Sequence, residues 1–415
     1  MLPPAVRFDF PILSQEIHGR PVAYLDNAAT TQKPQVVLDA ITQYYTTSNA
    51  NVHRGIHALA DRATTAWEDS RSVIAAFFAA RPDELVITRN TTEAVNGVRY
   101  GFLDHTLEKG DVVVCSVLDH HATLVTLQQA VQAAGAELVH LDVDADTFQV
   151  DLAQLEGVLQ TYTERVKCIS LTHTSNVLGS MLDLTRLDHI ISAIYAPADR
   201  PKVLLDAAQS APHMRLDFSH LPVDFLAFSG HKMYGPMGSG GLLVKQELSD
   251  SDQMRPWLFG GGMIASVSPE KTEFSPDAAE RFTAGTPDVA SAVGLASACQ
   301  YLGHLGLDQV ADHLSELVSY TVDRLTQIPR VQVISDPHSA SLVSFLYDGV
   351  HAHDVAQILD SQGVAVRSGH HCCMPLHTQF GWQASVRVSF AVYNTKEDVD
   401  QFVAGLEKIT QVFGA

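Results

Sequence analysis

Residues 202–232 read KVLLDAAQSAPHMRLDFSHLPVDFLAFSGHK, and this stretch contains two short apolar runs, at 203–205 and 225–228. Short uninterrupted apolar runs are typical of strands that are buried on both faces, as in a parallel sheet. Polar side chains follow both runs: Asp206 follows the first, and Ser229, His231 and Lys232 follow the second. Because ligand groups in an open parallel sheet gather at the carboxyl ends of strands, these side chains are the first candidates for a functional site.

The same pattern extends in both directions from this stretch. Further buried strands are expected at 112–117, 168–172 and 241–244, and helical spacing occurs at 124–134 and 185–196. Strands that alternate with helices indicate βα units and a mainly parallel sheet that is covered on both faces. The expected fold class is therefore α/β.

The pattern changes after residue 287. Helices are expected at 289–305 and 307–325, followed by strands at 342–347, 364–367 and 385–390 and by a final helix from Lys396. This succession predicts a second, smaller α+β unit. We expect a large α/β domain over 26–288 and a small α+β domain formed by 1–25 together with 289–415.

Composition and charge narrow the class of protein. The 415 residues carry a formal net charge of −20, which repels a phosphate backbone, so we expect no nucleic-acid partner. No apolar run is long enough to span a membrane and no signal peptide is recognised, so no membrane partner is expected. Of the five cysteines, Cys115, Cys168 and Cys299 lie alone in apolar surroundings, which is typical of reduced core residues. These features predict a cytoplasmic protein.

Lys232, directly after a buried strand in SGHKMYGPMGSGG (229–241), is a candidate Schiff-base lysine. Desolvation lowers the pKa of an ammonium group, and such an amine is nucleophilic near neutral pH. The alternative is a lysine whose stem is buried while its amine reaches the surface. Asp206 favours the first interpretation, because a pyridoxal-phosphate (PLP) site needs a carboxylate at the pyridine nitrogen. Asp206 could otherwise serve as the N-cap of a helix over 207–211.

Polar residues also follow two other expected strands, with His120 after 112–117 and Asn176 after 168–172. A helix start at 90–93 has the capping-box spacing, with Asn90 and Glu93 three residues apart. The exposed amides of a helix start, together with the hydroxyls of Thr91 and Thr92, would form a cradle for a phosphate. Capping boxes are common and mostly structural, so both interpretations stay open at this position.

The segment RSGHHCCMPL (367–376) concentrates histidine and cysteine. Four consecutive residues cannot readily surround one tetrahedral zinc ion, and no second ligand pair lies nearby, so we expect no metal. A disulfide between adjacent cysteines would close a strained ring. A reactive thiol in a loop fits better, with His370 and His371 as protonatable neighbours that favour the thiolate. Downstream, the planar fork of Arg387 is suited to clamp a substrate carboxylate.

Motifs along nearly the whole chain resemble the PLP-dependent cysteine desulfurases of the SufS/CsdA type, in the aminotransferase class V superfamily. The stretches that carry the resemblance are YLDNAATTQKP (24–34), NVHRGIHALA (51–60), TTEAVN (91–96), HHATLV (120–125), SNVLGS (175–180), DAAQSAPH (206–213), FSGHKMYGP (228–236), AGTPDV (284–289), RSGHHC (367–372) and AVYNTKEDVD (391–400). The resemblance implies PLP fold type I, a large mainly parallel-sheet domain with a smaller α+β domain that carries the nucleophile loop.

The resemblance also implies a role for each matching residue. Catalysis would rest on Lys232, which carries the cofactor and moves a proton, on His120, and on Cys372 as the nucleophile. The cofactor would be bound by Lys232, Asp206, Gln209, His120, Thr91, Thr92, Ser229 and His231, with Thr286 supplied by the other subunit of a homodimer. The substrate carboxylate would be bound by Asn176 and Arg387, with Arg54 nearby.

The chain departs from the family pattern at four positions. Asn90 replaces a glycine, Met237 a small or hydroxyl residue, Asp119 a glutamate, and Cys373 a small residue. The last departure leaves open whether Cys372 or Cys373 carries the sulfur.

The resemblance implies conversion of L-cysteine to L-alanine, with the sulfane sulfur captured as a persulfide on Cys372 and passed to a sulfur-acceptor protein, as in iron–sulfur cluster assembly. The alternatives are a selenocysteine lyase acting on L-selenocysteine, a class V aminotransferase or epimerase, and a weakly active PLP-bound partner protein. An aminotransferase has no need of a loop cysteine, and the presence of Lys232, Asp206 and Cys372 argues against the inactive partner.

Overall fold

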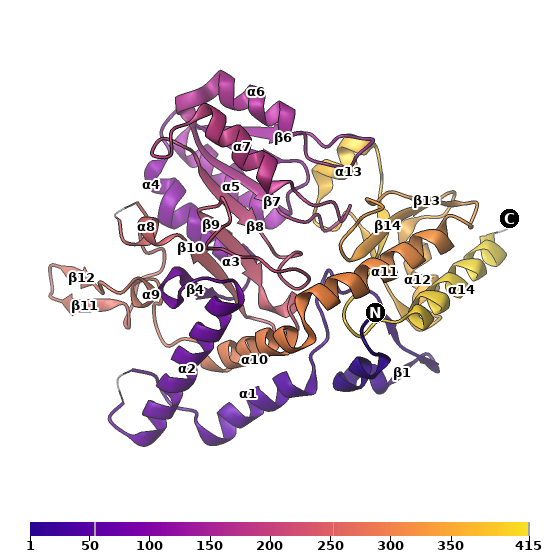
Figure 1. Ribbon diagram of the computed structural model, residues 1–415, viewed down its shortest axis with the longest axis horizontal. Coiled ribbons are helices and arrows are strands. Elements are labelled where there is room, and N and C mark those ends of the chain that lie inside the picture. The colour runs from indigo at the N-terminus through magenta and orange to yellow at the C-terminus, as the bar shows by residue number, and fades with distance from the viewer. Residues whose placement is uncertain (54, 252, 414–415) are drawn as a thin grey trace.

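A computed structural model describes residues 1–53, 55–251 and 253–413 of the chain (Figure 1). Its largest sheet has seven strands in the order β4-β10-β9-β8-β7-β5-β6. Their bounds are β4 (Leu85–Thr88), β5 (Val112–Ser116), β6 (Glu137–Leu141), β7 (Val166–Thr172), β8 (Lys202–Asp206), β9 (Phe225–Ser229) and β10 (Gly240–Val244). The five strands from β9 to β6 pair in parallel, while β10 pairs antiparallel with both β9 and β4.

Alternating residues of these strands enter two different hydrophobic clusters, because successive side chains of a strand point to opposite faces. On β5, Val113 and Cys115 pack with α3 (Thr91–Val98) and α5 (His121–Ala134) on one face. Val112 and Val114 pack on the other face with helices α2 (Ala58–Phe77), α6 (Leu152–Tyr162) and α7 (Leu184–Ile194). The sheet is thus covered by helices on both faces, as Figure 1 shows.

A second sheet of four strands has the order β13-β14-β17-β16. Its strands are β13 (Val331–Val333), β14 (Leu342–Tyr347), β16 (Arg367–Gly369) and β17 (Ser385–Ser389). The helices around it are α11 (Leu307–Leu325), α12 (Ala352–Asp360), α13 (Met374–Phe380) and α14 (Lys396–Phe413), and α10 (Val289–Leu305) leads to it from the larger sheet (Figure 1).

The first residues of the chain pack against this second unit. Strand β3 (Ala23–Tyr24) pairs in parallel with β15 (Val364–Ala365), and Arg7 forms an ion pair with Asp398. The other strands and α-helices of the described residues are β1 (Glu16–Ile17), β2 (Arg20–Pro21), β11 (Ile264–Val267), β12 (Thr272–Phe274), α1 (Gln35–Thr47), α4 (Asp104–Thr106), α8 (Gln246–Ser249) and α9 (Ala278–Arg281). Within the described residues, no helix is both long and apolar enough to cross a membrane.

The predicted fold class is confirmed: a large, mostly parallel sheet lies between helices, and a smaller α+β unit follows it. The expected helices 289–305 and 307–325 coincide with α10 and α11. The expected strand 364–367 is instead two strands, β15 and β16, which pair with different sheets. The chain leaves its pairing with β3 after β15 and pairs with β17 at β16. The apolar pattern of the sequence gives no signal for this change of pairing strand.

Candidate active site

A cavity of about 220 Å³ lies where the carboxyl ends of the large sheet meet the second unit. Four strands of the large sheet deliver polar residues to it: β5, β7, β8 and β9. The sequence-predicted residues that line the cavity are Thr91, Thr92, His120, Asn176, Asp206, Gln209, Ser229, His231, Lys232, Cys372 and Arg387. The structure therefore brings together eleven side chains that are spread over 297 positions of the sequence.

Lys232 ends the 3-10 turn η6 (Gly230–Lys232), which directly follows β9. Burial lowers the pKa of its ammonium group to about 8, and the carboxylate of Asp206 opposes part of that shift. A substantial neutral fraction of the amine is therefore present near neutral pH, as a covalent anchor and proton carrier requires.

Asp206 is the last residue of β8 and is buried. Its Oδ1 accepts a hydrogen bond from the Ala208 amide (2.9 Å), and the Thr123 hydroxyl lies 3.4 Å from Oδ2. Burial raises the pKa of Asp206, and Lys232 opposes the shift. A buried carboxylate of this kind is stabilised by a cationic ring nitrogen placed beside it.

His120 is the N-cap residue of α5, and its Nδ1 accepts a hydrogen bond from the Ala122 amide (3.0 Å). Burial and the positive charge of Lys232 lower the pKa of His120 to about 3. The ring is therefore neutral at physiological pH and carries its proton on Nε2. Gln209 is buried, and its amide nitrogen donates to the Ala28 carbonyl (2.9 Å).

Helix α3 begins at the cavity with Asn90 as its N-cap residue, whose side chain accepts from the Glu93 amide (3.0 Å). The hydroxyl of Ser229 accepts from the Thr91 amide (2.9 Å) and lies 2.7 Å from the Thr91 hydroxyl. A Cβ on Gly240 would lie 2.8 Å from the Asn90 Cα, so glycine is required for β10 to approach this helix start. The departure at Asn90 thus keeps the capping function, and this helix start with its hydroxyls is a candidate cradle for an anion.

Arg387 lies on β17 and is buried. Its guanidinium donates to the Asn176 carbonyl (2.8 Å) and to the Asp26 carboxylate (3.2 Å), while Arg367 lies 3.7 Å from the other oxygen of Asp26. Asn176 Oδ1 and Arg387 Nε are buried and have no partner among the described residues. Sequence reasoning gave Asp26 no role, although Asp26 follows a short apolar stretch at 22–25 and lies within the motif YLDNAATTQKP (24–34).

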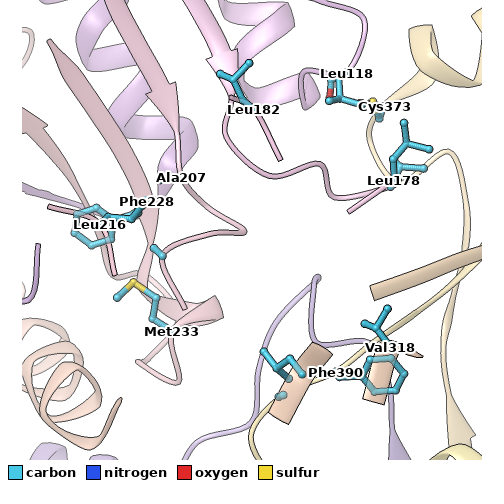
Figure 2. Close-up of a cluster of buried hydrophobic side chains, with 14 of the residues drawn as sticks. Leu118, Leu178, Leu182, Ala207, Leu216, Phe228, Met233, Val318, Cys373 and Phe390 are labelled. Carbon is cyan, nitrogen blue, oxygen red and sulfur yellow. Dashed lines mark hydrogen bonds between the residues drawn. The ribbon is translucent and has the colours of Figure 1, made fainter. Parts of the chain in front are cut away.

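The two adjacent cysteines have opposite environments. Cys372 is exposed and lines the cavity, and its carbonyl accepts from the His121 amide (2.8 Å). Cys373 is fully buried beside Leu118, whose carbonyl lies 3.3 Å from its Sγ, and burial raises the pKa of its thiol (Figure 2). Backbone φ angles of 52° at His371 and 58° at Cys372 turn the chain sharply, so the two neighbouring thiols point in different directions.

The expectation that the loop histidines favour a thiolate is wrong for His371. His371 is buried, and its burial and the charge of Arg387 hold the pKa of its ring well below the ordinary value. Its ring is therefore neutral and cannot favour a thiolate by charge. One other predicted residue lies apart from the cavity: Thr286 lines a separate cavity of about 440 Å³. The prediction for Arg54 falls outside the described residues.

The residues of the cavity fit PLP in chemistry and in arrangement. An amine with a lowered pKa, a buried carboxylate and a helix-start anion cradle would hold the aldehyde, the ring nitrogen and the phosphate respectively. The unpartnered Asn176 Oδ1 and Arg387 Nε leave hydrogen-bonding capacity for a ligand. Fold and site together define a PLP enzyme of fold type I.

Comparison with known proteins narrows this class. Residues 23–402 match the family model described as aminotransferase class V. The chain is 45% identical to probable cysteine desulfurase 2 of Mycobacterium leprae, over 99% of this chain and 97% of that protein. Among solved structures, it resembles the cysteine desulfurase of Thermococcus onnurineus (TM-score 0.90, 36% identity, 99% and 98% of the two chains). CsdA of Escherichia coli is similar to the same degree (TM-score 0.89, 35% identity, 99% of each chain). The chain belongs to the cysteine desulfurase family within aminotransferase class V.

Proposed function

We propose that the protein removes sulfur from L-cysteine, releases L-alanine and holds the sulfur as a persulfide on Cys372. The observation that carries this proposal is an exposed thiol in the same cavity as the half-buried Lys232 amine. An enzyme that only moved an amino group would need the lysine but no thiol. When bound, PLP supplies an electron sink that acidifies the substrate Cα–H bond and stabilises the resulting negative charge.

The residues of the chain carry out the remaining steps. Arg387 and Asn176 orient the substrate through its carboxylate, and Lys232 takes the Cα proton. The Cys372 thiolate then attacks the substrate sulfur: the Sγ–S bond forms and the Cβ–S bond breaks, with its electron pair left on Cβ. Protons return to Cβ and Cα, and L-alanine leaves. The cysteine thiol thereby becomes a persulfide, and no external oxidant or reductant is required.

His120 is proposed to stack on the cofactor ring, with Gln209 at its phenolic oxygen and Thr91, Thr92, Ser229 and His231 around its phosphate. The neutral state of His120 supports this role, because a cation beside a positively charged ring nitrogen would be repelled. For Cys372, the support is its exposure, in contrast to the buried Cys373.

We also propose a cytoplasmic homodimer that passes its sulfur to an acceptor protein. Thr286 is exposed and lies in a different cavity from Lys232, which is consistent with Thr286 binding the cofactor in the site of a second subunit. Exposure of Cys372 supports transfer to an outside acceptor. The proposed division into 26–288 and 1–25 with 289–415 is supported by the two sheets, one of which ends at Val244 while the other begins at Val331.

The test uses three variants of the full chain loaded with PLP. Lys232→Ala should lose the yellow colour of the lysine-linked cofactor, and Cys372→Ala should keep the colour but form neither alanine nor a protein persulfide from L-cysteine. Cys373→Ala is the matched control and should retain both activities. If Cys373→Ala is inactive while Cys372→Ala turns over normally, the nucleophile is misassigned. If wild-type protein forms no alanine from L-cysteine, the proposed substrate is wrong.

A further inference from the structure

The turn that carries Lys232 is held in a conformation that the local sequence does not favour. Tyr234, two residues beyond Lys232, is fully buried and has a φ of 64°, in the left-handed region that a bulky side chain rarely adopts. Its amide donates to the hydroxyl of Thr31 (2.9 Å), and its own hydroxyl accepts from the Val392 amide (3.1 Å). Strained turns of this kind persist only where surrounding contacts over-determine them.

The strongest of these contacts converge on one atom, the carbonyl oxygen of His231, which belongs to the peptide that precedes Lys232. Four donors from residues 30–33 lie within hydrogen-bond distance of it. They are the Thr31 amide (3.1 Å), the Thr30 hydroxyl (3.1 Å), the Thr31 hydroxyl (3.1 Å) and the Lys33 ammonium (2.9 Å). A carbonyl oxygen has two lone pairs, so four donors are more than satisfaction of a buried acceptor requires.

Lys33 is the unusual member of this group. Its amine is directed inward, donates to the carbonyls of Thr31 (2.6 Å) and His231, and has no carboxylate within ion-pair distance in the described part of the chain. Burial lowers the pKa of Lys33 to about 7. Burying an amine without a counter-ion is unfavourable. Thr30 and Thr31 alone could hold this segment against the turn that carries Lys232.

The contacts have a specific consequence for Lys232. Its side chain has two tasks, to hold the cofactor and to move the Cα proton, and both require its Cα to stay fixed while the side chain moves. The carbonyl bound by residues 30–33 lies one bond from the amide of Lys232. Fixing that peptide plane therefore fixes the direction in which the Lys232 side chain leaves the backbone.

We propose that Lys33, assisted by Thr30 and Thr31, is a positioning residue that aligns Lys232 through the carbonyl of His231. This inference depends on the proposed function only for the role of Lys232. The segment is expected to act on the reaction rate and not on substrate affinity, because Lys33 does not line the cavity that contains Arg387 and Asn176, the residues proposed to bind the substrate.

The test compares Lys33→Met, which removes the hydrogen-bond donors and keeps the aliphatic stem, with Lys33→Arg, which keeps hydrogen-bond donors at the end of the stem. Thr30→Val removes a single donor and serves if Lys33→Met does not fold. Lys245→Met is the matched control: Lys245 is also half-buried and donates to backbone carbonyls, those of Phe218 and Ser219, away from the cavity. Four quantities are measured: kcat and KM for L-cysteine, the pH midpoint of the cofactor's visible absorbance, and hydrogen exchange at the Tyr234 amide in cofactor-free protein.

For Lys33→Met we expect kcat to fall about tenfold or more with KM unchanged within about twofold, since misplacement of a reacting group acts on the rate. The absorbance midpoint should move by about half a pH unit or more, and exchange at Tyr234 should quicken several-fold. Thr30→Val should show smaller changes in the same direction. Lys33→Arg should restore most of the kcat, and Lys245→Met should leave all four quantities unchanged even if it lowers the melting temperature.

The proposal is overturned if Lys33→Met lowers only the melting temperature, or if Lys245→Met changes the site to the same extent. Lys232→Ala is measured in parallel to separate this outcome from failure of the proposed function. If Lys232→Ala keeps a lysine-linked cofactor spectrum, the assignment of Lys232 is wrong. If the protein does not act on L-cysteine, the absorbance and exchange measurements still decide the role of Lys33.

Discussion

Replacing Lys232 by methionine is expected to stabilise the cofactor-free protein, although it removes the residue on which the chemistry depends. Burial holds the pKa of Lys232 near 8, whereas an unfolded chain would show the ordinary value of 10.5. At neutral pH the unfolded state therefore binds a proton more tightly than the folded state does, and this difference favours unfolding. Methionine has a stem of similar length and no charge, so it removes this cost.

The size of the effect follows from the two pKa values. A difference of about 2.5 units at about 1.4 kcal/mol per unit gives about 3 kcal/mol at pH 7.5. The difference should shrink to below about 1 kcal/mol at pH 10, because the folded lysine is then neutral and the pH approaches 10.5, where the unfolded lysine also begins to lose its proton. For a chain of 415 residues the unfolding entropy is about 0.9 kcal/mol per degree, so Lys232→Met should melt about 3 °C above wild type at pH 7.5.

The assay is a series of thermal melts of cofactor-free wild type and variant between pH 7.5 and 10. Lys33 also has a lowered pKa, but it is present in both proteins and cancels in the difference. Lys396→Met is a control of opposite sign, because the hydrogen bond that Lys396 donates to the Glu316 carboxylate raises the pKa of Lys396. A gap that stays constant over this pH range, or a variant that melts below wild type at pH 7.5, would refute the proposed burial cost of Lys232.

Three further outcomes are expected. Arg387→Lys should raise KM for L-cysteine about tenfold or more in steady-state kinetics, because an ammonium cannot reproduce the planar fork of the guanidinium. An unchanged KM would exclude the proposed binding of the substrate carboxylate by Arg387. Asn90→Ala should lower the free energy of unfolding by about 1 kcal/mol and Asn90→Gly by only a few tenths, measured by denaturant melts; equal losses would contradict its capping role. His120 should remain neutral with its proton on Nε2 down to about pH 5 in nitrogen NMR spectra of the cofactor-free protein, because burial lowers its pKa to about 3, and a midpoint near 6.5 would contradict this.

Much of the fold was predictable because its signals are local. The apolar runs at 203–205 and 225–228 coincide with β8 and β9 to within two residues, and the amphipathic and apolar spacing of α10 and α11 gave their bounds. The edge strand β6 was missed, since its residues are mostly half-exposed and lack an uninterrupted apolar run. Strand β4 was missed although Leu85–Thr88 begins with a short apolar run like those that were recognised.

The residues of the site likewise fall into two groups, those that local sequence signals located and those that they did not. Asp206, Ser229 and Lys232 could be located because each ends or follows a strand of the large sheet, where position along the chain implies position in space. The contact of Arg387 with Asp26 spans 361 residues and depends on how the two units meet, which no local pattern encodes. The exposure of Cys372 and the burial of Cys373 accompany two left-handed backbone angles at His371 and Cys372, and the sequence carries no signal for such angles at non-glycine residues.

The arrangement of the two sheets imposes an order on biosynthesis. All strands of the large sheet, with Lys232 and Asp206 at their ends, have been translated once residue 244 is made. Cys372 and Arg387 are translated only after helices α10, α11 and α12. A growing chain thus holds its cofactor-binding groups before it holds the thiol or the arginine, so release of sulfur cannot begin until translation is nearly finished.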